Sequence, residues 1–236
     1  MLPIETARAI RSDRLAKIRS ANLAFPMADG AKVVVHSIPV RRDPYAINID
    51  VGRADRSALV PLGGWSQHPT YDFDGAYSVM PGPRDAARGY AALFRMGMIE
   101  AVDTALVPSR SYVEGVPRFI PSASVAGAII VGTRRFLAVQ QAAGVAAPVA
   151  IGVSLLGVKG FWLAVDDQRR TLLAHEVTEE DLIFPEVIVR DLAVDVMALL
   201  RSTFDQLWNA AGLASCADYD DARQLMIAIA TFENQR

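Results

Sequence analysis

Cysteine, histidine and lysine are scarce in this 236-residue sequence, and the shortages of cysteine and histidine narrow the possible functions. The single cysteine, Cys216, cannot form an intramolecular disulfide, and no secretory signal follows Met1, so we expect a cytoplasmic protein. The three histidines, His36, His68 and His175, show no metal-binding spacing with one another or with the cysteine. The sequence therefore predicts neither a metal nor any other cofactor.

Motifs for nucleotide binding and for a nucleophilic serine are also missing from the sequence. Gly152, Gly157 and Gly160 lie in an apolar run without the spacing of a dinucleotide-binding turn, and there is no G-x-x-x-x-G-K-[ST] loop. Ser154 lies between glycines at the wrong offsets for a nucleophile elbow. Without a catalytic pattern, the sequence favours a non-enzymatic role.

The overall charge is nearly balanced, with 24 basic and 26 acidic residues and a net charge of −2. A molecule with this balance has no long-range field that would attract a polyanion, so nucleic-acid binding would require a local basic patch. Arginine supplies 21 of the basic residues. This bias fits either a GC-rich genome or a need for planar, bidentate donors.

Apolar residues make up 52% of the chain, which is enough for a sizeable core, and their periodicity predicts an α+β fold. Two apolar stretches, 123–132 and 142–158, are expected to be a buried helix and a buried strand rather than membrane spans. We expect one domain over residues 1–236; the alternative is a division near residue 118 into a β-rich half, 1–118, and a helix-rich half, 119–236.

The predicted elements form an antiparallel strand meander, followed by helices and further strands, with a long amphipathic helix toward the C-terminus. Helices are expected at 4–21, 122–141, 187–211 and 220–232. Strands are expected at 32–40, 45–51, 71–79, 90–95, 98–102, 149–156, 161–165 and 172–175.

Two arginines interrupt the apolar side of the first predicted helix. Arg11 and Arg14 project into the same sector as its aliphatic residues, and a guanidinium near a core needs a carboxylate or phosphate partner. They therefore indicate either structural ion pairs or an anion-binding site. The residues that could build a pocket for a small anionic ligand, such as a nucleotide or metabolite, are Arg11, Arg14, Arg41 and Arg95 with Asp72, Asp74 and Glu100.

The same helix is strongly basic as a whole, carrying Arg8, Arg11, Arg14, Lys17 and Arg19. Such a patch could contact a phosphate backbone, or it could be an ordinary solvated face. Nucleic acid is accordingly a possible partner through this helix.

Two acidic residues, Asp72 and Asp74, alternate within the strand predicted at 71–79. Side chains two positions apart on a strand share one face at a separation of about 7 Å, which is a spacing that glycosidase acid/base pairs also use. The alternative interpretation is the solvated face of an antiparallel strand.

Several segments, in the same order and across nearly the whole chain, resemble a bacterial family. The similar proteins begin with a Schlafen-type AlbA domain associated with DNA binding, and the resemblance is to their C-terminal half. The segments are 8–18 (RAIRSDRLAKI), 33–39 (VVVHSIP), 71–75 (YDFDG), 90–100 (YAALFRMGMIE) and 204–212 (FDQLWNAAG).

The resemblance implies an accessory domain, because the AlbA domain itself has no counterpart in these residues. We expect either a stand-alone relative of the C-terminal domain or a fragment of a longer protein. The function that follows is a regulatory or interaction domain in a DNA-binding system, acting through a protein partner or self-association. No membrane association is expected.

Overall fold

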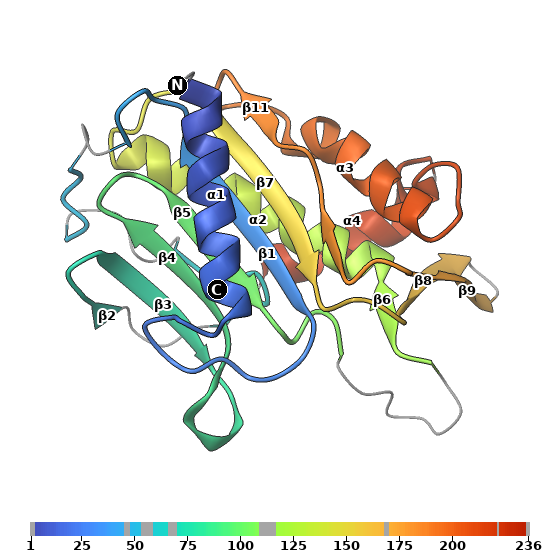
Figure 1. Ribbon diagram of the computed structural model, residues 1–236. Coiled ribbons are helices and arrows are strands. Elements are labelled where there is room, and N and C mark those ends of the chain that lie inside the picture. Colours follow the sequence, from blue (N-terminus) through green and yellow to red (C-terminus); the bar gives the residue numbers. More distant parts are fainter. Residues whose placement is uncertain are drawn as a thin grey trace.

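A computed structural model describes residues 3–44, 48–52, 59–65, 70–108, 117–167, 170–220 and 222–234. The described part of the chain has the predicted α+β class: helix α1 covers one face of a large sheet, and helices α2, α3 and α4 lie on the other side (Figure 1). The helices are α1 (Pro3–Arg19), α2 (Ser122–Ala142), α3 (Val196–Ala210) and α4 (Arg223–Glu233).

The large sheet has eight strands, all paired antiparallel, in the order β10-β7-β1-β5-β4-β3-β2, with β11 also paired to β7. A smaller sheet has the order β6-β8-β9. The strands are β1 (Lys32–Pro39), β2 (Thr70–Tyr71), β3 (Gly75–Pro81), β4 (Ala87–Phe94), β5 (Ile99–Asp103), β6 (Phe119–Pro121), β7 (Val149–Leu156), β8 (Trp162–Asp167), β9 (Arg170–Glu176), β10 (Asp181–Ile183) and β11 (Val187–Val189).

The centre of the large sheet is buried on both faces. Strand β7 is buried at every position, and so is β1 after its first residue. Alternate residues of β1 enter two separate apolar clusters: Val33 and Val35 pack on the α2 side, whereas Val34 and Ile38 pack on the α1 side. A continuous β-branched run is what a strand covered on both faces requires.

Helix α2 is the core helix that the sequence predicts. It is long and apolar enough to cross a membrane, but 72% of its most apolar stretch is buried inside the protein. Gly144, with a φ of +77°, follows its end as expected for a helix stop. The large sheet combines strands from both sides of residue 118.

The long helix predicted at 187–211 is wrong over its first nine residues, 187–195. Residues 187–189 form β11, which pairs with β7, and α3 begins only at Val196. Asp195 caps the helix by accepting hydrogen bonds from the backbone N–H groups of Met197 and Ala198. The β-branched triplet at 187–189 completes the edge of β7, so tertiary pairing overrides a helical periodicity that happened to continue through it.

Two further strand predictions need correction. The segment 71–79 is not one strand: it turns back at 72–74, so that β2 and β3 form a hairpin. In the segment predicted at 45–51, residues 45–47 lie outside the described residues, and 48–52 are irregular and end in a turn. The hairpin of β4 and β5 is confirmed, and β6, β10 and β11 are short strands that the sequence did not reveal.

Candidate functional site

Helix α1 places polar groups where a helix on a sheet normally places apolar ones. Its buried residues, Ala7, Arg11, Leu15 and Ile18, recur at the spacing of one helix face, and an arginine occupies the middle of that stripe. Arg14, one turn further on, is also largely buried, with 17% of its side chain exposed. The interface between α1 and the sheet is therefore built around two guanidinium groups.

Arg11 is held entirely by groups of the protein. Its Nη1 donates to the carbonyl of Phe184 and to Glu186, both at 2.8 Å, and its Nη2 donates to the carbonyl of Val153 at 2.7 Å and to the hydroxyl of Ser154 at 2.9 Å. Gly152 leaves the space for this side chain, because a Cβ there would lie 2.5 Å from the Nε of Arg11. Arg11 thus forms a structural ion pair with Glu186, and its hydrogen bonds to the sheet hold the guanidinium in place.

Arg14 forms a two-point ion pair with Glu100 of β5. Arg14 Nε donates to Oε2 at 2.8 Å and Nη2 donates to Oε1 at 2.6 Å, and the guanidinium lies 4.9 Å from the ring centre of Phe94. The Glu100 carboxylate is fully buried. Burial alone would raise the pKa of Glu100, but hydrogen bonds from Arg14 and His36 lower it to about 2, so the carboxylate is charged at neutral pH.

Two more side chains of the sheet complete the shell of Glu100. The Tyr90 hydroxyl donates to Oε1 at 2.6 Å, and the Nε2 of His36 lies 2.9 Å from Oε2. Because Glu100 is ionised, the proton of this contact belongs to Nε2 of His36. The Nδ1 of His36 has no hydrogen-bond partner among the described residues. Burial raises the pKa of Tyr90, and the charge of Glu100 adds to this effect.

Above this buried cluster lies a cavity of about 350 Å³, which we call the α1 pocket. Its walls come from the C-terminal half of α1, from the segment that follows it and from the β2–β3 hairpin. The lining residues are Arg14, Lys17, Asn22, Leu23, Ala24, Phe25, Asp72, Asp74, Tyr77 and Tyr90.

A cluster of aromatic rings packs together at the α1 pocket. The Phe25 ring meets Tyr90 edge-on at 5.0 Å and Tyr77 at 5.8 Å, and Tyr77 in turn meets Phe94 at 6.0 Å. Both tyrosines are buried. Burial raises the pKa of Tyr77, and its interaction with Asp72 raises it further, so Tyr77 keeps its proton at neutral pH.

The hairpin turn carries both carboxylates of the α1 pocket. Asp72 Oδ1 accepts hydrogen bonds from the backbone N–H groups of Asp74 and Gly75 at 2.8 and 2.9 Å, which stabilises the turn. The prediction that Asp72 and Asp74 share one face of a strand is therefore wrong. A turn-forming aspartate requires the chain to reverse here, and both side chains lie at the rim of the pocket instead.

Arg95 and Arg41 do not line the α1 pocket. The Nε of Arg95 donates to the carbonyl of Phe73 at 2.9 Å, and its backbone N–H donates to the carbonyl of Asp74, so Arg95 supports the hairpin turn from outside. Arg41 follows the end of β1 and is half-buried. Of the residues singled out in the sequence, the structure brings together Arg14, Asp72 and Asp74 around the pocket, with Glu100 beneath.

The basic side chains of α1 are each paired with a carboxylate. Besides Arg11 and Arg14, three exposed or half-exposed pairs are present, and such pairs leave little net positive charge on the helix surface. They are Arg8 with Glu186 at 3.0 Å, Lys17 with Asp13 at 3.0 Å, and Arg19 with Asp181 at 2.7 Å.

Sequence reasoning missed the aromatic and histidine members of the site. His36, Tyr77 and Tyr90 sit on three different strands and meet only because β5 lies between β1 and β4 and because β3 follows β4. The sequence did offer one signal, because His36 is a polar residue inside a β-branched run and so indicates a buried polar contact. Phe25 lies in a segment without regular structure, where periodicity predicts nothing.

Among the described residues there is no group of three or more histidine, cysteine or acidic side chains placed to hold a metal ion. Comparisons with protein-family models, with curated proteins and with solved structures gave no match. The resemblance to proteins with a Schlafen-type AlbA domain therefore stays a prediction.

Proposed function

We propose that this chain is a non-enzymatic regulatory domain that binds a small organic cation, such as a primary amine, in the α1 pocket. The observation that carries the proposal is the distribution of charge around that pocket. Its two basic side chains each have a carboxylate partner, whereas its two aspartates form no ion pair with a cation in the described part of the chain.

The distribution of charge around the α1 pocket also disfavours the anionic ligand that the sequence suggested. Arg14 donates from Nε and Nη2 to Glu100, and Lys17 is 3.0 Å from Asp13. An anion in this pocket would lie beside carboxylates, because each basic side chain already has a carboxylate partner and Asp72 and Asp74 are in the lining. An ammonium group would instead gain two carboxylate acceptors at the rim.

The shape and the walls of the α1 pocket suit a small ligand with an apolar portion. A volume of about 350 Å³ lies at the lower end of the range for small-molecule sites. The half-buried Phe25 offers its ring to the body of a ligand, with the buried Tyr77 and Tyr90 packed against it, and a cation gains further stabilisation near such rings. The buried Glu100 cluster supplies a floor that is fixed before binding.

The test is a thermal-unfolding titration of the whole chain with putrescine and ethanolamine, beside inorganic phosphate and adenosine monophosphate. At a ligand concentration 100 times the dissociation constant, binding adds about 2.7 kcal/mol to the free energy of unfolding. For a chain of this size the melting temperature then rises by roughly 5 to 10 °C. Stabilisation by the anions and not by the amines would contradict the proposal.

A matched pair of variants assigns the effect to the α1 pocket. The double variant Asp72→Asn/Asp74→Asn removes both charges while keeping an oxygen at position 72 to hold the turn. It should abolish stabilisation by amines. Asp29→Asn, which removes an exposed carboxylate outside the pocket lining, should respond like the wild type.

The regulatory part of the proposal draws on the predicted resemblance to an accessory domain. In such a protein, ligand binding at α1 would change the interaction of this helix with the domain or partner that contacts it. The same resemblance makes a protein partner or a second copy the expected target of that signal.

A further inference from the structure

The outer side of α4 is apolar although it faces solvent. Met226 and Ile227 are 51% and 52% exposed, and Ala230 is exposed beside them. The opposite side of the helix already contributes Leu225 and Ile229 to the core. A helix that is apolar on both sides is typical of one that is covered on both sides.

Five exposed residues of α4 form one stripe with opposite charges at its two ends. At 100° per residue, Arg223, Met226, Ile227, Ala230 and Glu233 fall within about a third of the helix circumference. The stripe begins with a cation and ends with an anion, and its middle is apolar. We call these five residues the α4 stripe.

We propose that the α4 stripe is a homodimer interface, in which α4 packs antiparallel against α4 of a second copy of this chain. A twofold axis at the level of Ala228 sets Arg223 of each copy opposite Glu233 of the partner subunit. The same axis sets Met226 opposite Ala230. The stripe is thus complementary to itself in charge and in the alternation of large and small side chains, as a twofold interface requires.

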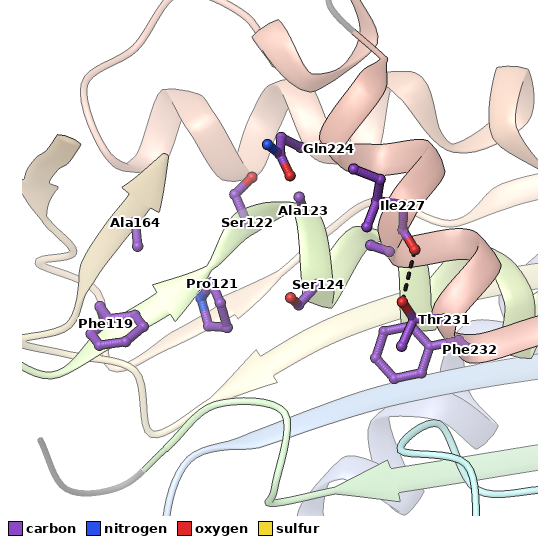
Figure 2. Close-up of a pocket in the computed structure, with 11 residues that line it drawn as sticks. Phe119, Pro121, Ser122, Ala123, Ser124, Ala164, Gln224, Ile227, Thr231 and Phe232 are labelled. Carbon is purple, nitrogen blue, oxygen red and sulfur yellow. Dashed lines mark hydrogen bonds between the residues drawn. The ribbon is translucent and has the colours of Figure 1, made fainter. Parts of the chain in front are cut away.

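A groove beside the stripe extends the contact area beyond one short helix. It has a volume of about 400 Å³ and runs between α4 and β6. Figure 2 shows Gln224, Ile227 and Thr231 of α4 on one side of this groove and Phe119 and Pro121 of β6 on the other. Ile227 belongs to the stripe and also lines the groove. A second copy that packs on the stripe therefore also covers the apolar wall of the groove.

Both charged ends of the stripe, Arg223 and Glu233, also interact within the chain, and these interactions do not prevent the pairing. Arg134 and Glu233 lie 3.0 Å apart, with 39% and 51% of their side chains exposed. Exposed pairs of this kind contribute little free energy, and the carboxylate can accept from a second arginine. The interface lies on the side of the sheet opposite the α1 pocket, so it stands independently of the proposed ligand.

The experiment is sedimentation velocity of the whole chain at about 50 μM, a concentration well above a micromolar dissociation constant. The wild type should sediment with twice the mass of the 25.5 kDa chain. Met226→Glu/Ile227→Glu should sediment as a monomer. Ile183→Glu, at an equally exposed isoleucine on β10, should remain a dimer. A monomeric wild type, or equal dissociation of the Ile183 variant, overturns the proposal.

A charge swap tests the antiparallel register. Arg223→Glu and Glu233→Arg should each weaken the dimer by about 5- to 10-fold in dissociation constant, and the double variant should recover most of the loss. Circular dichroism confirms that each variant is folded. Single variants that weaken the dimer without recovery in the double variant overturn the α4-to-α4 pairing.

Discussion

Arg14 and Glu100 lie on elements 86 residues apart and form a two-point ion pair, at 2.8 and 2.6 Å, between α1 and the middle of the sheet. Glu100 has no exposed surface. Its Oε1 also accepts a hydrogen bond from the Tyr90 hydroxyl, and its Oε2 is in hydrogen-bond contact with Nε2 of His36. The pair fixes the C-terminal half of α1 on the sheet. It also places the buried floor beneath the α1 pocket, so the fold and the proposed binding site depend on the same carboxylate.

Removing the charge of Glu100 should destabilise the protein strongly. Glu100→Gln leaves the Arg14 guanidinium buried beside a neutral group, and breaking one half of a buried pair typically costs about 3 to 5 kcal/mol. Urea unfolding followed by circular dichroism measures the loss. The exposed Glu180→Gln is the control and should change the free energy of unfolding by less than about 0.5 kcal/mol. A loss below about 1 kcal/mol in Glu100→Gln would show that the pair does not anchor α1.

Stability should fall steeply in acid because of the same carboxylate. The pKa of Glu100 is about 2 in the folded protein, below its ordinary value of 4.5. A lowered pKa contributes stability that is present above pH 4.5 and is lost as the pH falls toward 2, and a depression of this size corresponds to about 3 kcal/mol. Urea unfolding at a series of pH values tests this. Glu100→Gln should lose less stability over the same window, and parallel curves would contradict the assignment.

Gly152 should not tolerate a side chain. A Cβ at this position would lie 2.5 Å from the Nε of Arg11 and 2.8 Å from its Cζ. Four hydrogen bonds hold the guanidinium in place, so it cannot move aside cheaply. We expect Gly152→Ala to cost about 1 to 3 kcal/mol in urea unfolding. In an Arg11→Ala background the same substitution should cost much less, and simple additivity would argue against the contact.

Nucleic-acid binding through α1 should be absent. The five basic residues of the helix are paired with carboxylates, which leaves no basic stripe to release counterions from a phosphate backbone. A gel-shift assay with duplex and single-stranded DNA at about 50 mM salt should show no retarded band at micromolar protein. Retardation that Arg8→Ala and Arg19→Ala abolish would contradict this expectation.

The sequence predicts well those elements whose local pattern and tertiary role agree. Helix α2, strand β7 and the β4–β5 hairpin lie within a few residues of their predicted positions, because each has a mostly apolar pattern ended by glycine or a turn. The segment 187–195 failed because its β-branched residues had a neighbouring strand edge to join. Only the arrangement of β7 in the sheet reveals that edge.

The candidate site was predictable in its arginines and not in its geometry. Arg11 and Arg14 stand out in the sequence as charges on an apolar face, and this signal indicated buried partners. Which partners they have depends on long-range pairing, since Glu186 and Glu100 reach them from distant strands or loops. Asp72 and Asp74 were misplaced because a strand pattern and a turn-forming aspartate look alike over three residues.

The most direct test of the proposed function is isothermal titration calorimetry of putrescine into the whole chain and into Asp72→Asn/Asp74→Asn. We expect saturable one-to-one binding to the wild type that is at least 10-fold weaker in the double variant, while phosphate gives no signal. Putrescine binding that is equal in both proteins, or binding of phosphate alone, would contradict the proposed function.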